Sequence, residues 1–170
     1  MKMTELFLSQ LEVEANLSRR ALERVPEGRN DWKPHEKSTP LGYLAALVAS
    51  MPAWIILTVD QDAFDLAGPG NGTFRPKEWR TKSELLAMLD ANVAKAREAL
   101  AKTTDEDLMK TWKFLINGQV VQQQPRYEML FSGVFCHMAH HRGQLTVYLR
   151  LNDAPVPALY GPSADEGKAG

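Results

Sequence analysis

Three of the four histidines in this chain lie within one short segment, Cys136 to Gln144. If the segment is helical, His137 and His141 stack on one face, one turn above the other. Two imidazoles in this arrangement can chelate a single metal ion. Neutral imidazole suits zinc, nickel, iron or manganese. The spacing therefore predicts a divalent-metal site at His137 and His141.

A metal-free interpretation of the same pair also stands. Both histidines fall on a helix stripe that otherwise carries Leu130, Val134 and Tyr148, so their rings are expected to point inward. Buried histidines are often satisfied by hydroxyl, carboxylate or backbone groups. A catalytic metal site normally has three protein ligands, and the pair supplies two. The spacing alone leaves open whether the pair binds a metal or fills the core.

Other side chains with reactive groups lie near the pair. His140 points about a quarter turn away from His141, so we expect it behind the site or at an interface. Cys136 shares the face of His140 and is predicted to be a buried, inert thiol. Arg142 and Arg150 are expected to form ion pairs at the surface or at an interface.

Composition places the chain among ordinary soluble proteins. Hydrophobic residues make up 44% of the 170 residues and charged residues 24%, which favours one domain over residues 1–170. The net charge is −1 and no basic stripe is present, so we expect no nucleic-acid partner. The single cysteine excludes an intrachain disulfide and fits a reducing compartment.

No segment has the pattern of a membrane span or of a signal peptide. The longest apolar stretch, 44–59, is interrupted by Ser50, Pro52 and Thr58 and is better interpreted as a buried helix. The first residues are followed by acidic ones and not by an apolar run. We therefore expect a cytoplasmic protein with no membrane partner.

Hydrophobic periodicity predicts four long helices. Pro52 should kink the second helix, and Thr81 with Glu84 forms a capping box before the third. Asn117-Gly118 is typical of a hairpin turn in the one strand-like passage, 113–121. The predicted fold class is all-α, an up-down-down-up four-helix bundle with a small β-hairpin before the last helix. The helices are expected over 4–25, from 40 onward, 81–100 and 125–151, with a glycine-rich loop at 68–72 and an irregular tail over 152–170.

Several stretches carry a resemblance to a known family. Residues 136–145 have the pattern Cys-His-x-x-His-His-Arg-Gly-Gln-Leu and are followed by Val147–Leu151. The tail adds Pro155–Pro157 and Tyr160–Glu166, and Ser38–Ala45 looks like the entry to the second helix. Together these stretches span nearly the whole chain and closely resemble the DinB-like (DinB/YfiT) family.

The resemblance implies a bacterial four-helix bundle, often dimeric, with a metal site of three histidines. One ligand comes from the second helix and two from the last, and His137 and His141 match the latter two. The second-helix ligand should fall at Leu47, whose isobutyl group cannot coordinate a metal. The resemblance therefore implies a site that lacks one of its three ligands.

Three other side chains are candidates for the missing position. Met51 and Tyr43 lie one turn to either side of Leu47, and Glu14 falls near the apolar stripe of the first helix, where an edge position is expected. A thioether suits soft ions, and the phenol would need to lose its proton. None of the three is a convincing substitute.

Two function hypotheses follow. Known relatives of the family imply a metal-dependent hydrolase or a thiol-dependent transferase, with His137 and His141 holding the ion. The alternative is a metal-free bundle that acts as a small-ligand-binding or stress-related structural protein. The wide apolar surface of the last helix favours a homodimer in either case.

Overall fold

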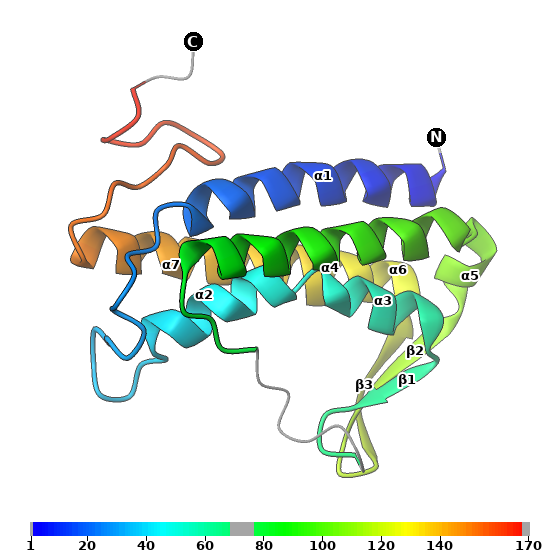
Figure 1. Cartoon of the computed structure of the whole chain (residues 1–170). Coiled ribbons are helices and arrows are strands. Elements are labelled where there is room, and N and C mark those ends of the chain that lie inside the picture. The colour runs from blue at the N-terminus through cyan, green and yellow to red at the C-terminus, as the bar shows by residue number, and fades with distance from the viewer. Residues whose placement is uncertain (1, 69–76, 168–170) are drawn as a thin grey trace.

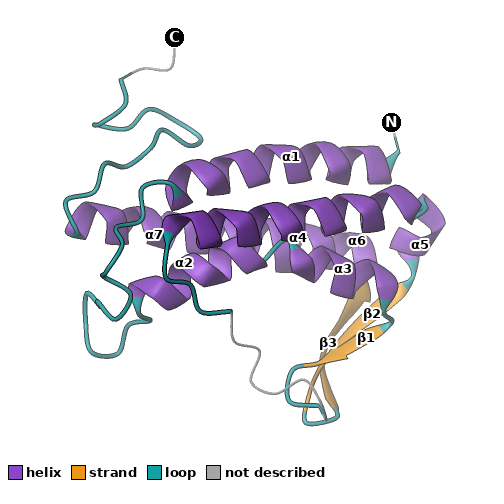
Figure 2. Cartoon of the chain, in the orientation of Figure 1, coloured by secondary structure: helices purple, strands orange, loops and turns teal. Residues whose placement is uncertain are grey.

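A computed structural model describes residues 2–68 and 77–167 of the chain. The long helices run side by side, and a small sheet lies against one end of them (Figures 1 and 2). The loop predicted at 68–72 lies, apart from Gly68, outside the described residues. The elements, in chain order, are α1 (Met3–Leu22), α2 (Leu41–Ser50), α3 (Ala53–Asp60), β1 (Ala63–Asp65), α4 (Lys82–Lys102), α5 (Asp105–Met109), β2 (Thr111–Ile116), β3 (Gln119–Pro125), α6 (Arg126–Glu128), the π-helix η1 (Met129–Cys136) and α7 (His137–Leu151).

The helices share one apolar core. Helices α1, α2, α4 and α7 pack against one another, and α3 packs against α4 and η1. Each of α1, α2, α4 and α7 contributes an almost completely buried leucine to the same cluster: Leu11, Leu44, Leu89 and Leu145. Burying a leucine contributes roughly 1.5–3 kcal/mol, so this shared cluster is the main force that holds the helices together.

Two helix boundaries follow the predictions from local sequence. Thr81 accepts a hydrogen bond from the backbone of Glu84 and completes the capping box that begins α4. Helix α2 ends at Ser50 and α3 begins at Ala53, with a bend of 46° between them. Pro52 lies in this break, and its missing N–H explains the interruption. Helix α2 begins at Leu41, and Pro40 occupies its cap position.

Within the described residues, no single helix has both the length and the apolar character needed to cross a membrane. Helices α2 and α3 reach the length and hydropathy of a membrane span only when they are counted together, and they are bent by 46°. Most of the residues of α2 are buried against the other helices.

The all-α fold class is wrong, because a three-stranded sheet accompanies the helices. The predicted hairpin is present: β2 and β3 are antiparallel, and Asn117 and Gly118 form the turn with φ of 52° and 77°. The unpredicted element is β1, which adds to the other edge of β2 in parallel, with Phe64 opposite Phe114. The sheet is therefore mixed, with the order β1-β2-β3.

Side-chain contacts fix the sheet to the helices. Arg126 is buried at the start of the last helical segment and donates to the carboxylate of Asp62, just before β1, at 2.7 Å. Trp112 on β2 donates its indole N–H to the backbone oxygen of Leu57 on α3 at 3.2 Å. The sheet is therefore held in place next to α3 and α6.

The last helical segment is not the uniform α-helix that periodicity predicted. Residues Met129–Cys136 form a π-helix between α6 and α7. A π-turn adds a residue to each turn and changes which side chains share a face. Such turns are rare, and they often occur at functional sites. Here the π-helix ends directly before His137.

The sequence predicted Arg142 at the surface or an interface and Glu14 at a helix edge, and both predictions are wrong. Arg142 is completely buried and donates to the carboxylate of Glu14 at 2.6 Å. It also donates to the Ser18 hydroxyl at 3.1 Å, while the Tyr160 hydroxyl donates to Glu14 at 2.8 Å. The network joins α7 to α1 in the interior, and Tyr160 connects the tail to it from the surface.

The tail after α7 is irregular but attached along its length. Arg150 donates to Asp165 at 3.1 Å, which confirms the ion pair predicted for Arg150. Arg24, just beyond α1, donates to Glu166 at 3.0 Å. Together with Tyr160, these pairs hold the tail against α1 and α7.

Removal of one partner of the buried ion pair is expected to be strongly destabilising. Glu14→Ala leaves the Arg142 guanidinium buried without its counter-ion, which should cost about 3–5 kcal/mol of unfolding free energy. Urea denaturation measures this loss. The matched control is Glu12→Ala, which removes the exposed partner of Arg97 and should have little effect. Equal losses in the two variants would contradict the structural role given to Glu14.

Candidate metal and ligand site

His137 and His141 converge from successive turns of α7. Their Nε2 atoms lie 2.8 Å apart, and their ring centroids 4.5 Å apart. Both side chains are half-buried. The two imidazoles therefore share one helix face and direct the same ring atom to one point, which the spacing of four residues predicted.

The opposite nitrogen of each ring is held by another group. Nδ1 of His141 lies 2.7 Å from Oε1 of Gln144, an amide oxygen that only accepts, so Nδ1 donates. A hydrogen bond to the backbone of Gly133 raises the pKa of His137, so this backbone group accepts a hydrogen bond from a ring N–H. Since Nε2 of His137 faces His141, its Nδ1 is the donor. In the tautomer in which both Nδ1 atoms carry the proton, each Nε2 has a lone pair directed at the other.

Burial keeps both histidines neutral near pH 7. Desolvation lowers the pKa of His137 below the ordinary value of 6.5, with a further lowering from His141, and outweighs the Gly133 hydrogen bond. Desolvation also lowers the pKa of His141 and outweighs the hydrogen bond to Gln144. Neutral imidazole is the form that binds metals. Metal-bound histidines also usually donate their second ring N–H to an acceptor.

The described residues do not supply a third protein ligand. No cluster of three or more His, Cys, Asp or Glu side chains suited to a metal ion occurs in ranges 2–68 and 77–167. Leu47 is half-buried and packs against the core. The side chain that contacts the pair from α3 is Trp54, whose ring meets that of His137 edge-on at 5.2 Å. The placement of Leu47 opposite the pair stays a prediction.

The three substitutes considered for the missing ligand occupy other environments. Met51 is fully buried in the core, and Tyr43 is exposed. Glu14 is engaged by Arg142. Its carboxylate therefore neutralises a buried cation.

The two reactive neighbours of the pair face outward. His140 is exposed, with its ring centroid 5.0 Å from that of His141. Cys136 is also exposed, so the prediction of a buried thiol is wrong. Cys136 and His140 are both exposed, so the error concerns the burial predicted for Cys136.

A cavity of about 350 Å³ adjoins the histidines. Its walls come from α3, the sheet and η1, and His137 is one of its lining residues. The lining is mainly aromatic and aliphatic, and it includes Trp54, Trp112 and Phe114. A pocket of this size and composition, next to two groups able to bind a metal, is the usual form of a small-molecule site.

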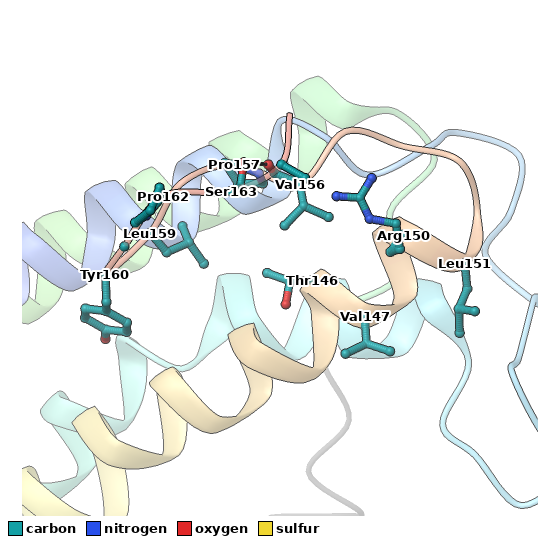
Figure 3. Close-up of a pocket in the computed structure, with 12 residues that line it drawn as sticks. Thr146, Val147, Arg150, Leu151, Val156, Pro157, Leu159, Tyr160, Pro162 and Ser163 are labelled. Carbon is teal, nitrogen blue, oxygen red and sulfur yellow. Dashed lines mark hydrogen bonds between the residues drawn. The ribbon is translucent and has the colours of Figure 1, made fainter. Parts of the chain in front are cut away.

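A second, larger cavity of about 530 Å³ lies between α7 and the tail. In Figure 3, Thr146 projects from α7 toward the tail segment that carries Leu159. Among the described residues that line it, Arg150 alone can carry charge at neutral pH, and it is paired with Asp165. These residues include no histidine, cysteine or carboxylate, so this cavity is less suited to chemistry than the one beside His137.

Comparison with known protein families agrees with the architecture. The sequence pattern of the DinB family matches residues 1–169. The chain belongs to the DinB family. The resemblance detected in the histidine segment and the tail is thus confirmed over almost the entire length of the chain.

One curated protein and two solved structures are similar to this chain over most of its length. The uncharacterized protein YrdA of Bacillus subtilis (strain 168) is 25% identical over 164 residues, which cover 94% of this chain and 89% of that protein. A DinB-like protein from Bacillus cereus ATCC 10987 has a crystal structure that matches with a TM-score of 0.71 at 21% identity, over 92% of this chain and 97% of that one. The DinB-like protein YjoA of Bacillus subtilis matches with a TM-score of 0.66 at 18% identity, over 89% and 95%.

Sequence reasoning found the two histidines but missed the cavity beside them. The missed residues are aromatic side chains on α3 and on the sheet. Phe64 joins the others only because β1 pairs with β2. The alternation of Trp112 and Phe114 along one strand was the signal available, since residues two apart face the same side of a sheet. Nothing comparable marks β1, which has three residues.

The lowered pKa values predict a pH dependence of stability. As pH falls through 6.5, the histidines of the unfolded chain bind protons while the buried pair stays neutral, so the unfolded state is favoured. Stability should therefore decrease below this pH. The double variant His137→Gln, His141→Gln should lose less stability over the same range. Urea denaturation between neutral and mildly acidic pH, in the presence of a chelator, measures the difference, and identical slopes would show that the pair is not buried neutral.

Proposed function

We propose that His137 and His141 bind one divalent metal ion through their Nε2 atoms and that the site serves metal-dependent chemistry on a small molecule. The observation that carries the proposal is the approach of these two atoms to 2.8 Å while Gln144 and Gly133 hold the other side of each ring. Two facing lone pairs repel each other, and a cation between them removes the repulsion. Zinc, nickel, iron and manganese all accept imidazole ligands.

Three residues of this chain would have separate roles in such a site. His137 and His141 hold the ion, and Gln144 keeps the His141 ring in the required orientation. When bound, the ion makes a coordinated water or thiol more acidic and so supplies a nucleophile at neutral pH. With Leu47 in place of a third histidine, the remaining positions are left to water, a thiol or the substrate. Hydrolysis and thiol transfer are the two reactions that this arrangement supports.

Metal titration of protein without a histidine tag tests the proposal. We expect one equivalent of a divalent transition metal per chain, with binding lost in His137→Ala and in His141→Ala. His140→Ala is the matched control, because His140 is adjacent in sequence but exposed, and its binding should equal that of the unchanged protein. Elemental analysis and calorimetric titration provide the measurements. Metal content far below one equivalent after incubation with zinc and with nickel would overturn the proposal.

Two further variants test how the site is built. Gln144→Leu removes the acceptor for Nδ1 of His141 and should weaken metal binding by roughly 10–100-fold. Leu47→His should strengthen binding, because it would restore the third ligand implied by the family. An unchanged titration of Leu47→His would show that Leu47 does not face the pair.

We also propose that the protein forms a homodimer through the outer side of its last helical segment. Large apolar side chains are exposed there, including Phe131 at 64%, Val147 at 57% and Leu151 at 54%. Val147→Glu should shift the protein toward the monomer in size-exclusion chromatography with light scattering. Val13→Glu, on the exposed side of α1, is the control and should leave the mass unchanged. A monomeric unchanged protein would refute the dimer.

A further inference from the structure

The outer side of the last helical segment carries one large apolar projection, the ring of Phe131. Phe131 belongs to η1 and is 64% exposed. Successive residues turn by about 100° in α7 and by roughly 80° in the wider π-helix, so Phe131 lies on the same flank as Gly143 and Arg150. All three residues are exposed. A Cβ atom built on Gly143 would meet nothing within 4 Å, so the helix surface beyond the ring is open.

The groove between α7 and the tail lies on this flank, further along the same helix (Figure 3). It has a volume of about 530 Å³ and is lined mainly by apolar residues. These include Val147 and Leu151 of α7 and Leu159 and Pro162 of the tail. Arg150, which alone among the described lining residues can be charged at neutral pH, is already paired with Asp165. One helix therefore presents an apolar projection and an apolar depression to the same side.

The spacing of the ring and the groove makes this surface complementary to itself. Leu149 marks the middle of the helical part of the groove, which extends from Thr146 to Leu151. Phe131 lies nine residues before His140 and Leu149 nine residues after it, so each is roughly 13 Å from His140 along the helix. A two-fold axis beside His140 would reverse the direction of the helix but would not exchange its flanks. The ring of each copy would then lie at the groove of the other copy.

The residues between the ring and the groove suit a contact between two copies. The exposed ones are Ser132, Cys136, His140, Gly143 and Gln144. None of them is Asp, Glu, Lys or Arg, and Arg142 in the same stretch is buried. Depletion of charged residues is typical of the core of a protein interface. No like charges from this stretch would therefore oppose each other when two copies meet.

The exposed apolar area is of the size that a dimer needs. Phe131 and Tyr160 are 64% and 68% exposed, and Val147 and Leu151 are 57% and 54% exposed. An aromatic side chain can bury about 150–250 Å², so these four residues offer on the order of 400 Å² in each copy. A stable interface buries about 800 Å² on each partner. The exposed residues between the ring and the groove, with the groove walls, lie where the remaining contact would form.

We propose that this surface binds a second copy of the chain in antiparallel orientation, with Phe131 of each copy inserted into the groove between α7 and the tail of the other. This arrangement rests on the homodimer proposed above and specifies its contacts. A large ring buried in an apolar pocket is the usual anchor of such an interface. The inserted ring would also hold the tail against α7, in addition to the hydrogen bonds that Arg150 and Tyr160 make.

A charge at the tip of the projection tests the insertion. Phe131→Glu places a carboxylate in an apolar groove, so it should raise the dissociation constant of the dimer by at least ~10-fold. The matched control is Val13→Glu, which adds the same charge to the exposed side of α1 and should change the constant by less than ~2-fold. Sedimentation equilibrium of the full-length protein measures both constants, and circular dichroism confirms the fold of each variant.

Cysteine cross-linking tests the antiparallel orientation. In a Cys136→Ser background, Phe131→Cys combined with Leu159→Cys should form a disulfide between copies under mild oxidation. Phe131→Cys alone should remain uncross-linked, because the two copies of this residue would lie roughly 27 Å apart, far beyond the reach of a disulfide. Phe131→Cys combined with Val13→Cys is the matched control and should also remain monomeric on non-reducing electrophoresis. A disulfide in Phe131→Cys alone would indicate parallel helices and overturn the proposal.

The two measurements separate this contact from the homodimer itself. A protein that sediments as a monomer at its highest soluble concentration would refute both. A dimer whose dissociation constant is unchanged by Phe131→Glu, or which gives no disulfide between positions 131 and 159, would keep the homodimer and refute the insertion of the ring.

Discussion

The buried ion pair between Arg142 and Glu14 determines how α7 is rotated in the structure. A guanidinium without exposure to solvent must keep its carboxylate partner, so the side of α7 that carries Arg142 is fixed against α1. Successive residues of a helix point about 100° apart. Once Arg142 faces α1, the neighbouring His141 is directed toward a different part of the structure, next to His137. The orientation of the histidine pair therefore depends on a contact that takes no part in its chemistry.

The tail contributes to the same constraint from the other side. The Tyr160 hydroxyl donates to Glu14, and burial together with this carboxylate raises the pKa of the phenol, so it stays protonated and able to donate. Arg150 and Arg24 hold the tail through Asp165 and Glu166. An irregular segment can keep a fixed position in this way, because its few polar side chains each meet a partner on a helix. The tail motif that supported the family resemblance thus has a structural role in this chain.

Local signals in the sequence were sufficient for some elements and not for others. The capping box at Thr81, the break at Pro52 and the turn at Asn117 depend on residues close in sequence, and they were predicted correctly. The pairing of Phe64 with Phe114 depends on residues far apart in sequence, and a strand of three residues has no periodicity to detect. The burial of Glu14 and Arg142 has the same origin, since each appears as an ordinary surface residue until its partner is known. The π-helix is a third case, because regular spacing was assumed through Met129–Cys136.

The errors about the fold and the incompleteness of the predicted site have one cause. A pair of histidines on a single helix is a local pattern, so it was found, whereas the cavity is made by three elements that meet only in the folded chain. With β1 absent, Phe64 would not lie beside Phe114, and the cavity would lose part of its wall. Several contacts hold β1 in this place: Arg126 donates to the Asp62 carboxylate and to the backbone oxygen of Gln61, and the backbone N–H of Gly118 donates to Asp65. A strand of three residues, held by its ladder to β2 and by these side-chain contacts, therefore converts a hairpin into one wall of the cavity next to the histidine pair.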